Sequence, residues 1–422
     1  MDKRIYEEYL EILKEELVPA LGCTEPIAIA YGAAKARELL GQLPEQIVVR
    51  CSGNIIKNVK AVIVPATGDM KGIETSAILG AVGGNADKKL EVLVDIRDED
   101  LEKTRELLKK KICRVELLEG VSNLQIIIEM SAGKETALAE IAFAHTNIVR
   151  LEKNGEVVFS KEKRAESAAE TDRSLLNLKD IYEFAKTVRI EDVQDLLDRQ
   201  LAYNMTIAKE GLTKKYGANV GATILKYYGD DVRNRARALP AAGSDARMNG
   251  CALPVMINSG SGNQGMTVSL PVAVFADYLF ADEETKYRAL VLSNLAAIYQ
   301  KNELGKLSAY CGAVSAATGA GAGIAYLHGG DFEVIMETMT NTLANVSGIV
   351  CDGAKASCAA KIASSVDAAI MAYYMAANHQ GFKNGEGLVK KDAEATIKSF
   401  GRMGREGMRS TDVEILKIML EP

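Results

Sequence analysis

A long stretch of small residues without a formal charge places the strongest constraint on how this 422-residue chain can fold. It is LSAYCGAVSAATGAGAGIAYLHGG at residues 307–330, apart from its single histidine an uncharged run long enough to cross a membrane. Glycine, serine and alanine dominate it, whereas leucine, isoleucine and phenylalanine are scarce, and this disfavours a membrane span. Small residues instead predict a buried helix that its neighbours approach closely, so no membrane association is expected.

Composition and charge narrow the class of protein further. Hydrophobic residues make up 48% of the chain, which is enough to bury a large core. The net charge is −6 and no basic run exceeds KKK at 109–111, which argues against a nucleic-acid partner. The first 21 residues predict a charged amphipathic helix rather than a signal peptide, so we expect a cytoplasmic protein. Its seven cysteines are then better explained as reduced thiols, some of them metal ligands, than as a disulfide framework.

The order of sequence patterns predicts an α+β fold in three segments. Residues 1–41 predict two helices, separated at Pro19 and restarting near Cys23. Residues 87–163 predict a smaller inserted α+β module, with strands at 90–96, 115–119, 124–130, 138–152 and 155–160 around a charged helix at 98–111. Residues 164–422 show apolar spacing of three and four almost to the end. We therefore predict a mainly α-helical catalytic domain from residues 1–86 and 164–422, interrupted by that module.

Neither the histidines nor the common catalytic motifs identify an active site in this sequence. The chain has three histidines, of which His145 and His379 suggest structural roles and His328 is a candidate for lining a site. HExxH, paired CxxC and GxSxG motifs are all absent from the sequence. A zinc site of the usual kind and a serine triad are therefore disfavoured.

Two glycine-containing loops are candidates for binding a small anion. NSGSGNQG at 258–265 and PATGDMKG at 65–72 offer backbone N–H groups that can approach a ligand closely. A carboxylate or phosphate would suit them, and plain connecting turns are the alternative. The candidate substrate-binding residues are Thr67, Gly68, Ser261, Gly262, Asn263 and Gln264.

The cysteines fall into two groups. Cys51, Cys113 and Cys251 stand singly among apolar neighbours, as buried thiols do, whereas Cys311, Cys351 and Cys358 stand at expected helix starts, where the helix dipole favours a thiolate. In CDGAKASC, a helix that begins at Cys351 puts both sulfurs on one face, and an unwound Asp-Gly turn makes them converge differently. Three cysteines without a nearby fourth form an incomplete ligand set for an iron–sulfur cluster, leaving one iron open to substrate. Three buried thiols are the alternative.

Several motifs in order resemble the L-cysteine desulfidases, relatives of the iron–sulfur L-serine dehydratases. They are LGCTEPIAIA at 21–30, SGNIIKNVKAVIVPATGDMKG at 52–72, NSGSGNQG at 258–265 and the last three cysteines, and the likeness covers nearly the whole chain. The resemblance implies a [4Fe–4S] cluster held by Cys311, Cys351 and Cys358, with Cys23 as the residue that removes a proton. It also implies conversion of L-cysteine and water to hydrogen sulfide, ammonia and pyruvate.

Other functions stay open at this point. Some of the dehydratase relatives end in a cysteine that can cap the open iron, whereas this chain ends DVEILKIMLEP, which favours the desulfidase branch without excluding L-serine as substrate. A pyridoxal-phosphate eliminase would need Lys57 or Lys355 as its Schiff-base lysine. A non-catalytic cysteine-binding or metal-storage protein is the third hypothesis. The expected partner is a small amino acid, and the Gly/Ala-rich helices are compatible with a homodimer.

Overall fold

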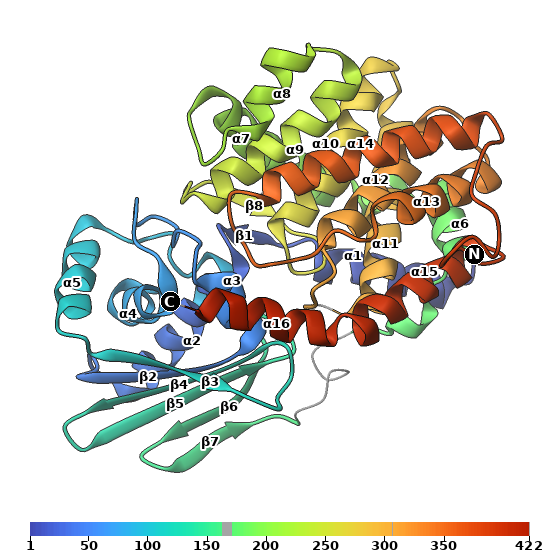
Figure 1. Cartoon of the computed structure of the whole chain (residues 1–422). Coiled ribbons are helices and arrows are strands. Elements are labelled where there is room, and N and C mark those ends of the chain that lie inside the picture. Colours follow the sequence, from blue (N-terminus) through green and yellow to red (C-terminus); the bar gives the residue numbers. More distant parts are fainter. Residues whose placement is uncertain (163–170, 306, 422) are drawn as a thin grey trace.

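The structure, a computed structural model, describes residues 1–162, 171–305 and 307–421. It has the α+β fold that the sequence predicts: a helical body stands beside a sheet covered by helices on one face (Figure 1). No helix within these described ranges is long and apolar enough to span a membrane.

The small-residue helix is the centre of the helical body. It is α12 (Gly312–Leu327), which is buried along nearly its whole length and packs against α10, α11, α13 and α14. A Cβ atom on Gly319 would lie 2.5 Å from the backbone oxygen of Ser293 on α11, so only glycine allows this approach. The predicted buried helix is therefore confirmed. The other helices of the body are α1 (Lys3–Glu16), α6 (Leu178–Thr187), α7 (Gln194–Thr213), α8 (Val220–Tyr228), α9 (Val232–Met248), α10 (Gly262–Tyr278), α11 (Glu283–Leu304), α13 (Phe332–Val346), α14 (Cys358–Ala377) and α15 (Ala393–Arg402).

A six-stranded sheet forms the second part, in the order β3-β2-β4-β5-β6-β7. All neighbouring strands are antiparallel except β2 and β3, which run parallel. The buried residues Ile126, Ile128 and Met130 alternate along β4 and mark the covered face, against which α2 packs. The strands are β2 (Gln46–Ser52), β3 (Cys113–Leu118), β4 (Gln125–Ala132), β5 (Glu135–Ala142), β6 (Ile148–Lys153) and β7 (Glu156–Ser160), and α2 (Thr24–Leu40), α4 (Gly72–Gly83) and α5 (Asp98–Lys109) accompany them.

Two features of this sheet differ from the strands that the sequence of residues 87–163 predicts. Its strand β2 comes from residues 46–52, so the sheet draws on the chain before residue 87. The strand expected at 90–96 is wrong, because this segment forms the 3-10 helix η1 (Ala86–Glu91) followed by turns. Its apolar residues Val92 and Leu93 are fully buried without being paired in a sheet, so burial alone produced the strand-like pattern.

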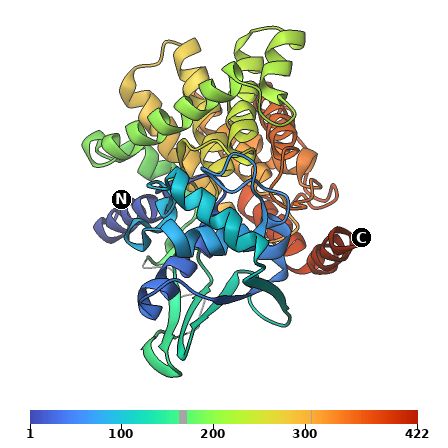
Figure 2. The same ribbon diagram turned by 90° about the vertical axis from the view of Figure 1, so that its left-hand side faces the viewer.

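A short second sheet joins the N-terminal region to the helical body. β1 (Pro19–Leu21) pairs antiparallel with β8 (Pro254–Met256), which sets the start of α2 beside the 258–265 loop. The predicted break at Pro19 and restart near Cys23 are confirmed. The short helix α3 (Gly53–Val59) follows β2, and the C-terminal helix α16 (Arg409–Leu420) crosses to it at the edge of the molecule (Figures 1 and 2).

Candidate functional site

Four cysteines from distant parts of the chain line one cavity of about 110 Å³. Cys23 is the N-cap residue of α2, Cys311 is the N-cap residue of α12, and Cys358 is the first residue of α14. Cys351 lies in the loop before α14. Three of the four thiols therefore stand at helix N-termini, where backbone N–H groups and the helix dipole favour negative charge.

A short backbone pairing brings Cys311 and Cys351 together although 40 residues separate them. Tyr310 and Val350 form an isolated antiparallel bridge. The N–H of Cys311 donates to the Ile349 oxygen at 3.1 Å, and the N–H of Cys351 donates to the Ala309 oxygen at 2.6 Å. Both cysteine backbones are thus fixed by hydrogen bonds rather than by their side chains.

Cys351 and Cys358 converge through a folded loop and not along one helix face. The helix α14 begins at Cys358, and Gly353 adopts a left-handed φ of 98° that turns the loop. This is the second of the two geometries left open by the sequence. Two lysines tie the loop together around Asp352: Lys355 Nζ lies 2.8 Å from its carboxylate, and Lys361 Nζ contacts the same carboxylate and donates to the Val350 oxygen at 2.9 Å.

The environment disfavours free thiolates at Cys311 and Cys358. Burial, together with the neighbouring Cys351 and Cys358, raises the pKa of Cys311 to about 12. Burial also raises the pKa of Cys358, while the charge of Lys361 opposes the rise at both residues. A bound cation would relieve the repulsion that these groups would feel once deprotonated.

The donor set fits an iron–sulfur cluster better than a single ion. Within the described residues, no group of three or more His, Cys, Asp or Glu side chains is spaced to hold one metal ion. A cluster binds each thiolate through a different iron, so its ligands do not have to meet at one point. Three soft sulfur donors around one cavity are the ligand type that such clusters use. Tyr310, beside Cys311, also lines the cavity, and its buried hydroxyl has no hydrogen-bond partner among the described residues.

Cys23 forms a hydrogen-bonded pair with Glu25 in the same cavity. The thiol donates to Glu25 Oε2 at 3.1 Å, and Asn58 Nδ2 donates to Oε1 at 2.8 Å. Burial alone would raise the pKa of Glu25, but His145, Cys23 and Arg247 offset it and hold the pKa at about 2. Burial, with the Glu25 charge, raises the pKa of Cys23 well above its ordinary value. The pair is thus an ionised carboxylate bonded to a protonated thiol, and the helix start does not lower the thiol pKa overall.

Arg247 supplies a buried cation to the same cavity. Only 2% of this residue is exposed, and its Nε donates to the Gly22 oxygen at 2.9 Å. Among the residues that the structure describes, no carboxylate oxygen lies within 4.0 Å of its guanidinium, so its charge is available to an anion. The Gly22 contact also ties Arg247 to the residue before Cys23.

The 258–265 loop contributes amide side chains beside Arg247. Ser261, Asn263 and Gln264 line the cavity, and the buried side-chain oxygens of Asn263 and Gln264 have no hydrogen-bond partner in the part of the chain that the structure describes. Gly262 lies against Arg247, where a Cβ atom would come within 2.5 Å of Nε. Gly265 allows the loop to approach β8, since a Cβ there would lie 1.9 Å from the Met256 oxygen. The cavity therefore offers the Arg247 guanidinium, and polar atoms that are unpaired among the described residues, to a small polar ligand.

Not every residue singled out by sequence lies here. Thr67 and Gly68 are not in the cavity lining, and the Thr67 hydroxyl donates to the Val64 oxygen at 2.7 Å within its own turn. His328 caps α12 and stacks near Phe275 and Tyr373, away from the cavity. His145 does line it; its Nε2 lies 3.9 Å from Glu25 Oε1 and has no hydrogen-bond partner within the described residues.

The lining residues that sequence reasoning missed include Glu25, Asn54, Asn58, Arg247 and Tyr310. Glu25 stands inside LGCTEPIAIA, two residues after the cysteine that was selected, and this proximity was a usable signal. Arg247 lies near the end of α9 among small and polar residues, and nothing in its local sequence marks it.

Comparison with known proteins points to one family. The family model described as the serine dehydratase alpha chain matches residues 87–417. A UPF0597 protein of Lachnoclostridium phytofermentans is 57% identical over 416 residues, which are 99% of this chain and 100% of that protein. UPF0597 proteins of Desulfitobacterium hafniense and Treponema denticola are 52% and 50% identical, and cover 99% and 100% of this chain and 97% and 99% of their own lengths.

Proposed function

Because this chain belongs to the serine dehydratase alpha chain family of iron–sulfur lyases, we propose that it eliminates hydrogen sulfide from L-cysteine, yielding pyruvate and ammonia. The observation that carries the proposal is the meeting of Cys311, Cys351 and Cys358 in one cavity with a separate thiol, Cys23. The resemblance of the motifs to the L-cysteine desulfidases supports sulfur, rather than oxygen, as the leaving atom.

The cofactor in this proposal is a [4Fe–4S] cluster on the three cysteines. When bound, it supplies a Lewis acid with an open coordination position. The protein contributes the remaining functions: it binds the substrate, orients it and carries protons.

Arg247 is the proposed partner of the substrate carboxylate. It is the buried cation of the cavity without an acidic partner within 4.0 Å among the described residues, and a guanidinium matches a carboxylate with two parallel hydrogen bonds. The unpaired oxygens of Asn263 and Gln264 are acceptors for a substrate ammonium group. Cation and acceptors together suit an amino acid better than a simple anion.

Cys23 and Glu25 are the proposed proton carriers. The Cys23 thiol donates a hydrogen bond to the ionised Glu25. As the sulfur accepts the α-proton, the thiol passes its own proton to that carboxylate, so no free thiolate has to form. The electron pair of the broken Cα–H bond forms the Cα–Cβ double bond, and the Cβ–S bond breaks to release HS⁻. The resulting aminoacrylate tautomerises and takes up water to give pyruvate and ammonia.

L-serine is the second candidate substrate, and the family's description as a serine dehydratase favours it. A pyridoxal-phosphate mechanism has less support, because neither Lys57 nor Lys355 lines the cavity and both are bonded to aspartates. The test is a panel of L-cysteine, L-serine and their D-isomers with anaerobically purified protein and with Cys23→Ala. Sulfide from L-cysteine that disappears in the variant supports the proposal, and wild-type turnover by the variant refutes the role of Cys23.

A further inference from the structure

We propose that Lys57 and Asp412 are positioning residues that clamp the Cys351 loop, so that docking of the C-terminal helix α16 determines how firmly the three-cysteine site is held. This proposal rests on the proposed function where it concerns how firmly a cluster is held. The mobility of the Cys351 loop can be measured whether or not a cluster is bound.

The C-terminal helix is attached by few contacts. None of its residues is buried, and it lies along the outside of the molecule next to α3 (Figures 1 and 2). Leu416 packs on Gly53, where a Cβ atom would lie 2.6 Å from the leucine side chain. Lys60 Nζ donates to the Met419 oxygen near the helix end. Its deepest polar anchor is therefore Asp412.

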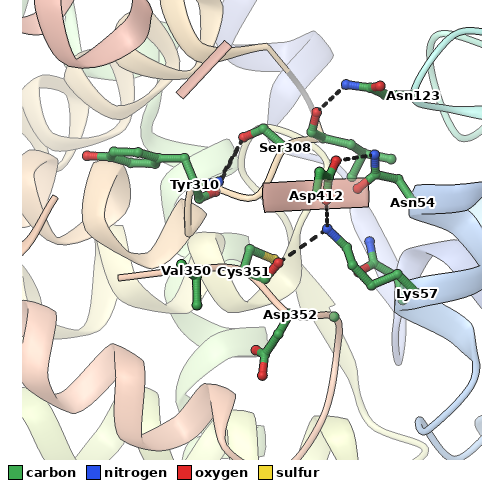
Figure 3. Close-up of polar contacts among 12 residues, drawn as sticks. Asn54, Lys57, Asn123, Ser308, Tyr310, Val350, Cys351, Asp352 and Asp412 are labelled. Carbon is green, nitrogen blue, oxygen red and sulfur yellow. Dashed lines mark hydrogen bonds and ion pairs between the residues drawn. The ribbon is translucent and has the colours of Figure 1, made fainter. Parts of the chain in front are cut away.

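Lys57 connects that anchor to the cysteine loop. Its side chain is 1% exposed, and Nζ donates to Asp412 Oδ1 at 2.5 Å and to the Cys351 backbone oxygen at 3.2 Å (Figure 3). A buried ammonium needs such acceptors, because an unpaired charge in the interior is strongly unfavourable. If Asp412 loses its charge, Lys57 loses the carboxylate that balances its buried ammonium, and the contact with the loop is expected to loosen.

The loop rests directly on the backbone of α3 as well. A Cβ atom on Gly353 would come within 2.4 Å of the Lys57 backbone oxygen, so the turn after Cys351 fits against Lys57 at close range. The side chain and the backbone of one residue thus contact the loop at two successive points. A shift of α3 or of Lys57 must therefore move the Cys351 segment.

Asp412 also reaches the wall of the cysteine cavity. Its second oxygen accepts from Asn54 Nδ2 at 2.7 Å. Asn54 and Ser308 line both the cysteine cavity and a larger outer cavity of about 720 Å³ that α16 borders. The Asp412 carboxylate on α16 thus contacts the Cys351 loop through Lys57, and it directly holds Asn54, which lines the cysteine cavity.

The test compares Asp412→Asn with Glu414→Gln in the full-length protein purified without oxygen. Glu414 is the matched control because it lies on the same helix, is 64% exposed in its side chain and pairs only with Lys417 in the described residues. Hydrogen exchange of a peptide covering residues 349–358 is measured first. The second readout is the rate at which iron and acid-labile sulfide are lost to a ferrous-iron chelator.

The proposal predicts exchange about tenfold or more faster in Asp412→Asn, with faster iron loss, while Glu414→Gln matches the wild type. Exchange within about twofold of the wild type in Asp412→Asn would overturn it. If Asp412→Asn does not fold, Lys57→Met/Asp412→Leu removes both charges and must still show the faster exchange; native protection there also overturns the proposal. Wild-type protein without iron or sulfide would count against the proposed function, while the exchange comparison still decides this inference.

Discussion

Replacing Arg247 with methionine tests the substrate-binding half of the site. The side chain keeps a similar length but loses the cavity's buried guanidinium, which has no carboxylate oxygen within 4.0 Å among the described residues. A hydrogen bond to a charged group contributes about 1.5–3 kcal/mol, so binding of a carboxylate ligand should weaken roughly 10- to 150-fold. Arg247 also donates to the Gly22 oxygen beside Cys23, so the turnover number is expected to fall as well.

Two inhibitors separate these effects. 3-Mercaptopropionate has the carboxylate without the amino group, and cysteamine has the amino group without the carboxylate. Inhibition constants are measured for both with wild type, Arg247→Met and Arg237→Met, the last being a control on the same helix whose guanidinium pairs with Asn234 and Asp367 outside the cavity. We predict that Arg247→Met weakens inhibition by 3-mercaptopropionate and not by cysteamine, and that Arg237→Met weakens neither. Equal losses for both inhibitors would refute carboxylate recognition by Arg247.

Three further predictions address the cluster, the packing and the pH dependence. Cys311→Ser should lose most bound iron because it removes one of three thiol ligands, whereas Cys113→Ser, away from the cavity, should keep it, as iron assays on anaerobic protein will show. Gly265→Ala places a Cβ atom 1.9 Å from a carbonyl oxygen, so it should lower the free energy of unfolding by about 2 kcal/mol or more in urea titrations. The control Gly348→Ala should change this free energy little, because no described atom lies within 4 Å of the added Cβ. Burial raises the pKa of Asp245 from 3.8 to about 6 in the folded protein. Because this pKa is higher in the folded state than in the unfolded state, the free energy of unfolding should fall by up to roughly 3 kcal/mol between pH 4 and pH 7. Asp245→Asn should remove that slope. Equal slopes in wild type and Asp245→Asn would contradict this assignment.

The parts of the fold that local sequence controls were predictable. Pro19 and the Cys-Thr-Glu-Pro segment marked the break and restart between α1 and α2, and the small-residue run marked α12. The 90–96 strand failed because its apolar residues are buried by packing and not by strand pairing. Hydrophobic pattern reports burial, and it distinguishes poorly between a strand and a buried turn of this length.

The site was predictable only in part, for a different reason. Cys311, Cys351 and Cys358 stood out by residue type and by resemblance, but their meeting depends on a bridge between residues 40 positions apart. Arg247 carries no local signal, because tertiary packing brings it to the cavity. Thr67 had the loop chemistry of a ligand-binding residue, yet its hydroxyl bonds within its own turn. Local chemistry identifies candidate residues, and long-range packing determines which of them meet.

The most direct test of the central claim measures pyruvate and sulfide formed from L-cysteine by anaerobically prepared protein, alongside its iron content, for wild type and Cys351→Ser. We predict that the wild type forms both products and contains iron, and that the variant loses iron and turnover together. Turnover of L-cysteine at the wild-type rate by iron-free protein would contradict the account.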